Sequence, residues 1–594
     1  MNWSDLPIDT RSDLHDKLDG SLTKGLVNRR EYLQFSLALG VGLVGATAVA
    51  DKLAAGQQNQ AGNAAAAKNH ASYDVIICGA GTSGCTLAGR LVAAGLKVLQ
   101  IEAGNWDDVE SVRKPGLWFT NLGGPLDWGD IAVPTPSVNN LPIASHMAKV
   151  LGGGSSINAT IWVRPPKADF DGWAQIAGDT KWNHDSATEV FKRVEDWHGP
   201  ASINRGTGGP VWVQRAEGVL SLSTDMLQAC RNQGLPVFED LNGQRELGIG
   251  GFALMNQIIK EGRRVNMAQA YVYPILDHPN YTLLTGTRVL RLISNGRNVR
   301  GVRVAGSDGS SRDYFADGEV VLSMGAIRTP QVLMLSGIGD REHLTTMGIK
   351  TQLNAPEVGR NLDDHILHGG VIWETLEPYD YVNSAANASG FWKSRPDLDR
   401  PDLNMVQIEL PYASETIAQQ YNPPGNSWAL CAGLVNPKSR GTVRLSSADP
   451  TAKPVVRANF LEHPDDVTAL KAGIDLARRI GNDSAMAGWS KREVAPGRDL
   501  DDVAKADFVR NGTTTFFHQV GTARMGTDNA AVVSSDLTVN GMHNLRIVDG
   551  SIMPRIVTCA TMATCVFIGE RGADEITSTW RSNGKGNGNS NGPR

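Results

Sequence analysis

The feature that most constrains the fold is a glycine-rich turn between two apolar runs, in YDVIICGAGTSGCTLAGRLVAAGLKVLQIEAG from Tyr73. The first run, Val75 to Cys78, is continuous and partly β-branched, which is typical of a buried parallel strand. The residues after the turn predict a helix from about Cys85 to Gly95. Lys97 to Ile101 is predicted to be a second strand. This order of elements indicates an α/β fold with parallel strands.

The spacing of Gly79, Gly81 and Gly84 gives G-x-G-x-x-G, which predicts a dinucleotide site. The first glycine permits the tight turn, the second lets a pyrophosphate approach the backbone, and the third lets the helix pack on the strand. The N–H groups and partial positive charge of the helix N-terminus favour phosphates. Glu102 ends the second strand, where it is expected to accept from a ribose hydroxyl. The pattern alone does not separate FAD from NAD.

Length and composition limit the class of protein. A chain of 594 residues is expected to form two domains, or one large domain with insertions. A net charge of −5 and a pI near 6.2 do not support a nucleic-acid binder. Six cysteines in a chain of this size do not form a disulfide framework. No CxxC or HExxH is present, so no metal site is predicted.

The N-terminal region predicts export. Arg29 and Arg30 precede a weakly apolar run from Ser36 to Ala50 that ends in the small-residue sequence Ala-Val-Ala. The run is too short and too glycine-rich for a membrane helix. The order resembles a bacterial twin-arginine signal over residues 1–50. We expect a linker over 51–71, a disordered tail over 581–594, and a periplasmic or secreted mature protein without a stable membrane span. The alternative is a chance arginine pair before an uncleaved anchor.

Three further stretches contain glycine-rich or strand–turn–helix patterns. The first stretch contains a Gly/Ser loop and begins at Ala148 with the sequence AKVLGGGSSINATIWVRPPKADFDGW. GAIRTPQVLMLSGIG begins at Gly325, and its Thr329-Pro330 predicts a helix start. FFHQVGTARMG, from Phe516, carries His518 in an apolar setting without metal-ligand spacing. A strand is predicted from Leu545 to Val548.

Together with VGRNLDDH from Val358 and GTGGPVWV from Gly206, these stretches resemble the glucose–methanol–choline (GMC) family of flavoprotein oxidoreductases. The resemblance runs from about Tyr73 to about Asp574. It implies an α/β fold, in which a Rossmann-like FAD-binding domain joins an α+β substrate domain containing an antiparallel sheet. The expected boundaries are 72–184, 252–348 and 512–580 for the FAD-binding domain, and 185–251 and 349–511 for the substrate-binding domain.

The resemblance also implies the cofactor contacts. FAD is expected to be bound non-covalently, because Ile157 stands where some family members attach it through a histidine. The residues expected to contact FAD are Gly79, Gly81, Thr82, Ser83, Gly84, Glu102, Ala103, Gly153, Ser155, Asn158, Ala159, Val289, Asp549, Gly550 and Met562.

In the resembled family, a base near the flavin removes the hydroxyl proton of an alcohol, and hydride passes to flavin N5. His518 matches the catalytic histidine, and its pKa range suits a general base. The second polar position of the family falls on Ala560, counted from both Asp549 and Glu570. A side-chain hydrogen bond is therefore expected to be missing. A water, a substrate group or Thr561 are the replacements that remain open.

The leading hypothesis is an exported FAD-dependent enzyme that oxidises a CH–OH group. The alternative, motivated by Ala560, is a non-redox or light-driven GMC relative, such as a hydroxynitrile lyase or a fatty-acid photodecarboxylase. A third possibility is a flavin-binding protein without catalysis. The electron acceptor, O₂ or a quinone or cytochrome, stays open. So does the small-molecule alcohol substrate, because YDYVNSAANASGFWKS from Tyr379 has no strong charge cluster. The stretch CATMATC is expected to be a flavin-facing loop rather than a disulfide loop, followed by a helix from about Ala563.

Overall fold

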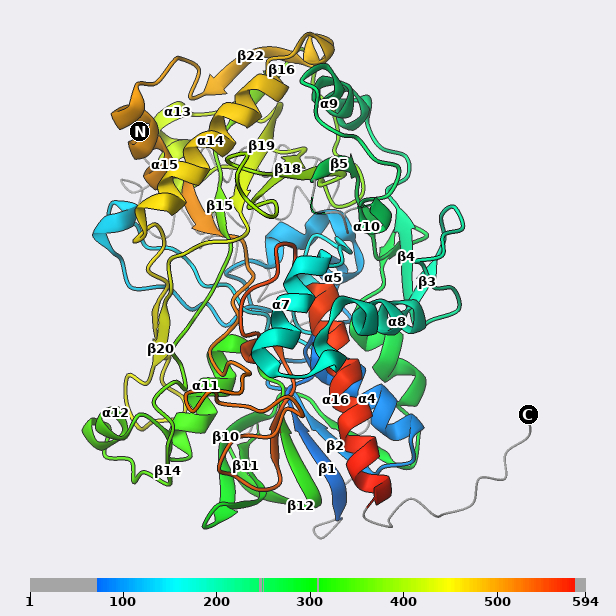
Figure 1. Ribbon diagram of the computed structural model, residues 1–594, viewed down its shortest axis with the longest axis vertical. Helices are drawn as coiled ribbons and strands as arrows, with labels where there is room; N and C mark the ends of the chain where they lie inside the picture. Colours follow the sequence, from blue (N-terminus) through cyan, green and yellow to red (C-terminus); the bar gives the residue numbers. More distant parts are fainter. Residues whose placement is uncertain (1–71, 245–247, 249, 307–308, 583–594) are drawn as a thin grey trace, which may run out of the picture.

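Two large sheets form the centre of the protein, one mainly parallel and one antiparallel (Figure 1). This computed structural model describes residues 72–244, 248, 250–306 and 309–582. The predicted signal peptide, the whole predicted linker and nearly all of the predicted tail lie outside the described residues.

The parallel sheet is built around the glycine-rich turn. Its strands, in spatial order, are β24 (Leu545–Ile547), β12 (Ser311–Leu322), β1 (Tyr73–Cys78), β2 (Val98–Ile101) and β9 (Tyr281–Leu284). β1, β2 and β24 confirm the three predicted strands to within two residues. All four residues of the apolar run at Val75 are at most 1% exposed, which explains its continuous apolar character.

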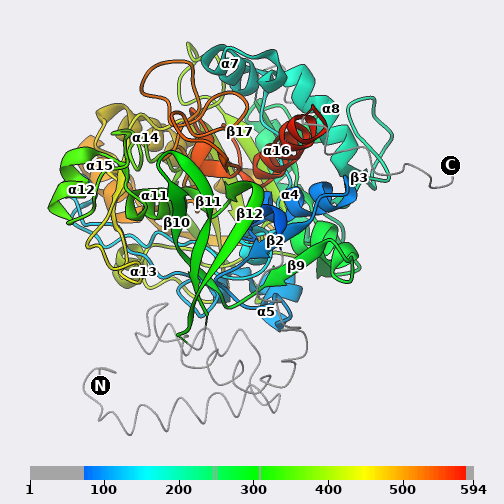
Figure 2. The same cartoon turned by 90° about the horizontal axis from the view of Figure 1, so that it is seen from below.

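Two helices pack against each other beside this sheet. α4 (Thr82–Ala93) follows β1, and α16 (Met562–Ser582) ends the described chain (Figures 1 and 2). α16 begins within a residue of its predicted start. α4 begins three residues before its predicted start at Cys85, because the turn ends at Gly81 and the helix follows at once. Strand β12 also pairs with an antiparallel ribbon, which is formed by β11 (Asn298–Ala305) and β10 (Arg288–Asn295).

The predicted helix start at Thr329-Pro330 is wrong. Helix α11 runs from Gly325 to Leu335 and holds Pro330 inside it. A proline in a helix leaves the carbonyl four residues earlier without its usual donor. Here that carbonyl belongs to Ala326, and the Thr522 hydroxyl donates to it over 2.6 Å. A hydrogen bond from a distant segment therefore makes the proline tolerable.

The antiparallel sheet forms the second layer. Its path is β22 (Ser490–Ala495), β16 (Ile372–Thr375), β19 (Ser427–Leu434), β18 (Leu403–Ile408), β17 (Ala388–Trp392) and β5 (Gly251–Leu254). β15 (Ile366–His368) pairs with β19 and with β23 (Thr513–Thr515). β5 and β23 thus extend this sheet a few residues beyond the predicted boundaries at 251 and 512. α14 (Pro464–Gly481) packs on β19 and β18, and α9 (Ser221–Asn232) packs on β5 and β17.

The remaining elements connect the two sheets or cover their edges. The other helices are α5 (Glu110–Arg113), α6 (Gly154–Ile157), α7 (Lys167–Ala177), α8 (His184–Val194), α10 (Leu241–Gln244), α12 (Arg341–Thr346), α13 (Glu415–Tyr421) and α15 (Asp502–Gly512). The other strands are β3 (Glu195–Trp197), β4 (Val211–Arg215), β6 (Asn256–Gln257), β7 (Ile259–Lys260), β8 (Arg263–Arg264), β13 (Ile338–Gly339), β14 (Leu353–Asn354), β20 (Thr442–Arg444) and β21 (Val455–Arg457). No helix within the described ranges is both long enough and apolar enough to cross a bilayer.

Candidate active site

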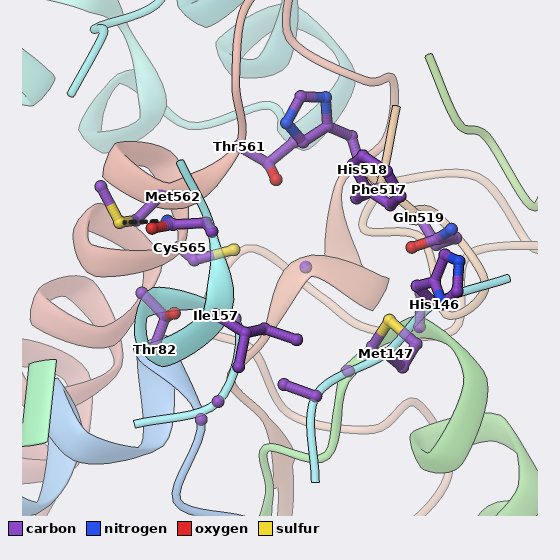
Figure 3. Close-up of a pocket in the computed structure, with 18 of the residues that line it drawn as sticks. Thr82, His146, Met147, Ile157, Phe517, His518, Gln519, Thr561, Met562 and Cys565 are labelled. Atoms are coloured by element: carbon purple, nitrogen blue, oxygen red, sulfur yellow. Dashed lines mark hydrogen bonds between the residues drawn. The ribbon is translucent and has the colours of Figure 1, made fainter. Parts of the chain in front are cut away.

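One large cavity lies between the two sheets. Its empty space, including the part open to solvent, is about 2120 Å³. Residues at the carboxyl ends of the parallel strands line one part of it, and residues from β15, β17 and β18 line another. Figure 3 shows side chains from both the glycine-rich segments and the loop around His518 facing this space. The geometry therefore places the predicted dinucleotide site and the predicted catalytic histidine in the same cavity.

The glycine-rich turn has the shape of a phosphate cradle. A Cβ at Gly79 would lie 2.2 Å from the Ser323 carbonyl oxygen, and one at Gly84 would lie 2.3 Å from the Gly79 oxygen. A Cβ at Gly81 would meet no protein atom closer than 4.0 Å, and Gly81 lines the cavity. No side chain caps the N-terminus of α4, whose first residues, Thr82 and Ser83, also line the cavity. Its amide groups are therefore available to an anion.

Glu102 lines the cavity at the end of β2. Its carboxylate accepts from the amides of Ala80, over 2.9 Å, and Gly104, over 2.7 Å. Burial raises the pKa of Glu102, and these amides oppose the rise. The carboxylate keeps further lone pairs for a hydroxyl donor. Its position fits the expected ribose contact.

The second glycine-rich loop packs against the first. A Cβ at Gly153 would lie 2.5 Å from the Gly81 Cα, and the backbone φ of +57° also favours glycine there. Gly153 and Asn158 line the cavity. Ser155 does not: its hydroxyl is buried, donates to the Gly152 carbonyl and accepts from the Met267 amide. Ser155, like Gly84, therefore packs beneath the glycine-rich loops and does not line the cavity.

Asn158 is held by three contacts. Its Oδ1 accepts from the Arg264 guanidinium over 2.7 Å and from the Thr160 amide over 2.9 Å. Its Nδ2 lies 2.9 Å from the Met562 sulfur, the contact drawn in Figure 3. Arg264 is buried and its pKa is lowered to about 9 by burial. Sequence reasoning missed this buried cation, because nothing near Arg264 in the sequence points to Asn158.

Asp549 lines the cavity at the end of β24. Its carboxylate accepts from the Gly325 amide over 2.9 Å and from the Thr329 hydroxyl over 2.6 Å, which ties the start of α11 to this strand. Burial raises its pKa, against the hydrogen bonds of Ser551 and Thr329. The remaining predicted contact residues also line the cavity, namely Ala103, Ala159, Val289, Gly550 and Met562.

His518 pairs with a second imidazole. His365 Nε2 lies 2.9 Å from the Val557 carbonyl oxygen, and its Nδ1 lies 2.9 Å from His518 Nδ1. The carbonyl can only accept, so His365 carries its proton on Nε2 and accepts at Nδ1. His518 must then donate from Nδ1. In neutral His518, Nε2 is therefore left with a lone pair.

The backbone around His518 is held in place by Asp364. The Asp364 carboxylate accepts from the His518 amide over 2.9 Å and from the Thr515 hydroxyl over 2.6 Å. Burial raises the pKa of Asp364 to about 7. Phe517 adopts a left-handed φ of +66°, which is uncommon for a non-glycine residue and is typical of functional loops. The loop is therefore strained and tied down where it presents the histidine.

Ala560 lines the cavity, together with Thr561. Alanine brings no hydrogen-bonding side chain there, as expected from the sequence. All six cysteines are free, including Cys559 and Cys565, so CATMATC forms no disulfide loop. Ile157 lines the cavity as well.

Comparison with known proteins decides the family. Models of the N- and C-terminal parts of GMC oxidoreductases match residues 73–367 and 437–569. The chain belongs to the GMC oxidoreductase family.

Relatives of this GMC oxidoreductase share most of its length. Choline oxidase from Arthrobacter globiformis is 34% identical over 523 residues, covering 85% of this chain and 94% of the relative. Alcohol dehydrogenase [acceptor] from Pseudomonas putida is 34% identical, with 85% and 95% covered. The crystal structure of pyridoxine 4-oxidase from Mesorbium loti is 30% identical with a TM-score of 0.80, covering 85% of this chain and 99% of the other.

These matches confirm the predicted fold and family, and with them an FAD-dependent oxidoreductase acting on CH–OH donors. The residues of this GMC chain fit FAD. Gly81 leaves space for a pyrophosphate, and the uncapped start of α4 offers amide donors to it. Glu102 offers an acceptor for a ribose hydroxyl.

A second histidine lines the cavity of this GMC oxidoreductase, and sequence reasoning missed it. His146 Nδ1 contacts the buried carboxylate of Asp127, which also accepts from the amides of Gly123 and Gly129. Burial would raise the pKa of Asp127, but His146 and these amides hold it below its usual value. Asp127 and His146 are 19 residues apart and belong to no motif, so no sequence signal pointed to them.

Proposed function

We propose that the chain oxidises the hydroxyl-bearing carbon of a small alcohol, with His518 as the general base. The observation that carries this proposal is the contact between the Nδ1 atoms of His518 and His365, with His365 Nε2 against the Val557 carbonyl. This arrangement assigns the His518 proton to Nδ1, which donates to His365, so Nε2 is free to accept a proton. The imidazole lines the cavity in which the cofactor residues lie.

Burial keeps His518 in the basic form. Burial lowers its pKa to about 3, below the near-neutral range expected from the sequence, so the imidazole is neutral at neutral pH and a weaker base than an exposed histidine. It can then take the hydroxyl proton at Nε2 while Nδ1 still donates to His365. Such a base typically contributes a factor of about 10²–10⁴ in rate. FAD, when bound, supplies the two-electron oxidation of the carbinol carbon.

The relatives support the same reaction class. Those reported above are named for the oxidation of choline, of pyridoxine and of an alcohol. The acceptor that reoxidises the reduced enzyme, O₂ or a quinone or cytochrome, is tested by comparing reoxidation in air with reoxidation by a quinone dye.

Anaerobic incubation of the holoenzyme with a panel of alcohols tests the proposal. We expect at least one alcohol to bleach the oxidised flavin absorbance. Absence of bleaching by every alcohol, combined with cyanohydrin cleavage or light-dependent CO₂ release, would instead support the lyase or photodecarboxylase alternative. Absence of every activity would support a flavin-binding protein without catalysis.

We also propose that FAD is bound non-covalently, because Ile157 offers no nucleophile at the cavity position it lines. Acid precipitation should leave all the flavin in the supernatant. Yellow colour that stays with the precipitated protein would contradict this.

Export through the twin-arginine route is a further part of the proposed function, supported by the order of Arg29, Arg30 and the apolar run up to Ala50. Replacing both arginines by lysine should keep the protein in the cytoplasmic fraction, at its unprocessed length. Normal periplasmic accumulation of that variant would contradict the proposal.

A further inference from the structure

One wall of the cavity is formed by the antiparallel sheet. Along β18, Asn404, Val406 and Ile408 line the cavity. The alternate residue Gln407 points away, because its Oε1 accepts from the Ser223 hydroxyl of α9. This is the two-residue period of a strand. The wall is therefore set by a rigid element rather than by a loop.

The side chains of this wall are mostly apolar. They are Met255, Leu367, Ala386, Phe391, Val406 and Ile408. Ala386 and Phe391 belong to the stretch from Tyr379, which has no strong charge cluster. Asn404 is polar, but both of its amide hydrogens are used, by the Ser389 hydroxyl and the Gly390 carbonyl, each over 2.9 Å. It can offer a ligand only its carbonyl oxygen.

The carboxylates of the cavity do not belong to the antiparallel-sheet wall. Among the described residues, Glu102 and Asp549 are the only acidic residues that line it. Both stand at the ends of parallel strands and already accept from backbone amides there. Within the same described part of the chain, the antiparallel-sheet wall brings no lysine, arginine, aspartate or glutamate to the cavity.

We propose that this wall selects an uncharged alcohol with an apolar body, and disfavours alcohols that carry a fixed charge. The inference rests on the proposed alcohol oxidation and names its substrate class. A charged group placed here would lose its hydration without gaining a counter-ion. The ring faces of residues such as Phe391 and Phe516 attract cations, but less strongly than burial of an unpaired charge costs.

Pairs of alcohols that differ only in charge test the inference. In 3,3-dimethylbutan-1-ol a carbon replaces the quaternary nitrogen of choline, so the two have the same shape. 4-Methylbenzyl alcohol and 4-(hydroxymethyl)benzoate form an anionic counterpart. We would measure anaerobic flavin reduction of the holoenzyme, and each dissociation constant from the perturbed flavin absorbance. The uncharged member of each pair should be favoured by at least about 100-fold in the ratio of rate to dissociation constant.

The outcomes separate this inference from the proposed function. Choline reducing the flavin as well as its carbon analogue would overturn the inference and leave alcohol oxidation standing. If no alcohol of any kind reduces the flavin, the proposed function fails. The dissociation constants would then still support the inference if the uncharged members bind more tightly, and overturn it if they do not.

A variant of the wall adds a second test. Leu367 lies on β15 and lines the cavity that His518 also lines. Leu367→Glu introduces a carboxylate there, and Leu367→Gln is the matched uncharged control. We expect Leu367→Glu to reduce the preference for 3,3-dimethylbutan-1-ol over choline by at least about tenfold relative to Leu367→Gln. Equal preferences in the two variants would contradict the placement of the substrate against this wall.

Discussion

At the scale of single residues, His365 and His518 act as a unit, because the proton on one imidazole determines the proton on the other. His365 accepts the Nδ1 proton of His518 over 2.9 Å. His365→Leu removes that acceptor and should slow flavin reduction by at least about tenfold. His365→Asn keeps an oxygen able to accept and should recover part of the rate. Stopped-flow reduction of both variants, at equal FAD content, checks this, and equal rates in wild type and His365→Leu would contradict the assigned tautomer.

Ala560 gives a prediction of the opposite sign. The cavity lacks a side-chain donor at this position. Ala560→Asn supplies one, and a charge-assisted hydrogen bond to the substrate oxygen should speed reduction by a simple alcohol about tenfold. Ala560→Leu is the control for bulk without hydrogen bonding. A rate that falls equally in both variants would show that the position is not directed at the reacting oxygen.

The role of a single residue could be predicted from the sequence only where the residue belongs to a recognisable motif. His518 was found because its neighbours resemble a family segment. His365 stood in a quoted motif, but its partner lies 153 residues away, and only the fold shows the contact. The Asp127–His146 pair belongs to no motif at all. Tertiary contacts of this kind leave no local pattern in a single sequence.

At the scale of elements, the packing of the two glycine loops against α4 determines what a substitution at each glycine does. Gly84→Ala places a Cβ 2.3 Å from the Gly79 oxygen and should destabilise the protein even without cofactor. The Cβ of Gly81→Ala would come no closer than 4.0 Å to any protein atom, so this substitution should leave the Tm of the apoprotein unchanged and lower its affinity for FAD instead. Thermal unfolding of the apoproteins and FAD titration separate the two effects. An unchanged FAD affinity in Gly81→Ala would contradict the position assigned to the pyrophosphate.

Elements with a clear period were predicted well from sequence. The buried strands β1, β2 and β24 consist mainly of apolar residues, and their predicted bounds hold to within two residues. Helix α11 was placed wrongly, because Pro330 is usually a start signal. The hydrogen bond from Thr522 to the Ala326 carbonyl, which makes an internal proline tolerable, comes from a segment almost 200 residues away.

At the scale of the whole molecule, His368 couples stability to pH. It is fully buried on β15, its Nε2 lies 3.0 Å from the Phe508 carbonyl, and burial lowers its pKa to about 4. At a pH between the ordinary pKa of histidine and this lowered value, His368 binds a proton in the unfolded chain but not in the folded protein. Stability is therefore lost as the pH falls, by about 2 kcal/mol from this group at pH 5.

Replacing His368 tests that coupling. His368→Asn should lose less stability than wild type between pH 7 and pH 5, by about 2 kcal/mol. The exposed residue His278 gives the control His278→Asn, which should behave as wild type. Denaturant unfolding at the two pH values measures the difference. A pH dependence unchanged by His368→Asn would show that folding does not lower the pKa of His368.

The arrangement of the two sheets came from resemblance rather than from periodicity. Short strands such as β15 and β23 pair across a long sequence separation, and local patterns do not encode such pairing. The cavity depends on this arrangement, since one part of it comes from each sheet. Its apolar wall therefore became visible only in the assembled structure.

Whether His518 is the base is tested by the rate of anaerobic flavin reduction in His518→Ala. The comparison uses an alcohol that bleaches the wild-type flavin, with both proteins at matched FAD content. We predict a loss of about 10²–10⁴-fold in this rate, because the variant lacks the Nε2 acceptor. Reduction by His518→Ala at the wild-type rate would contradict the assignment of His518 as the base.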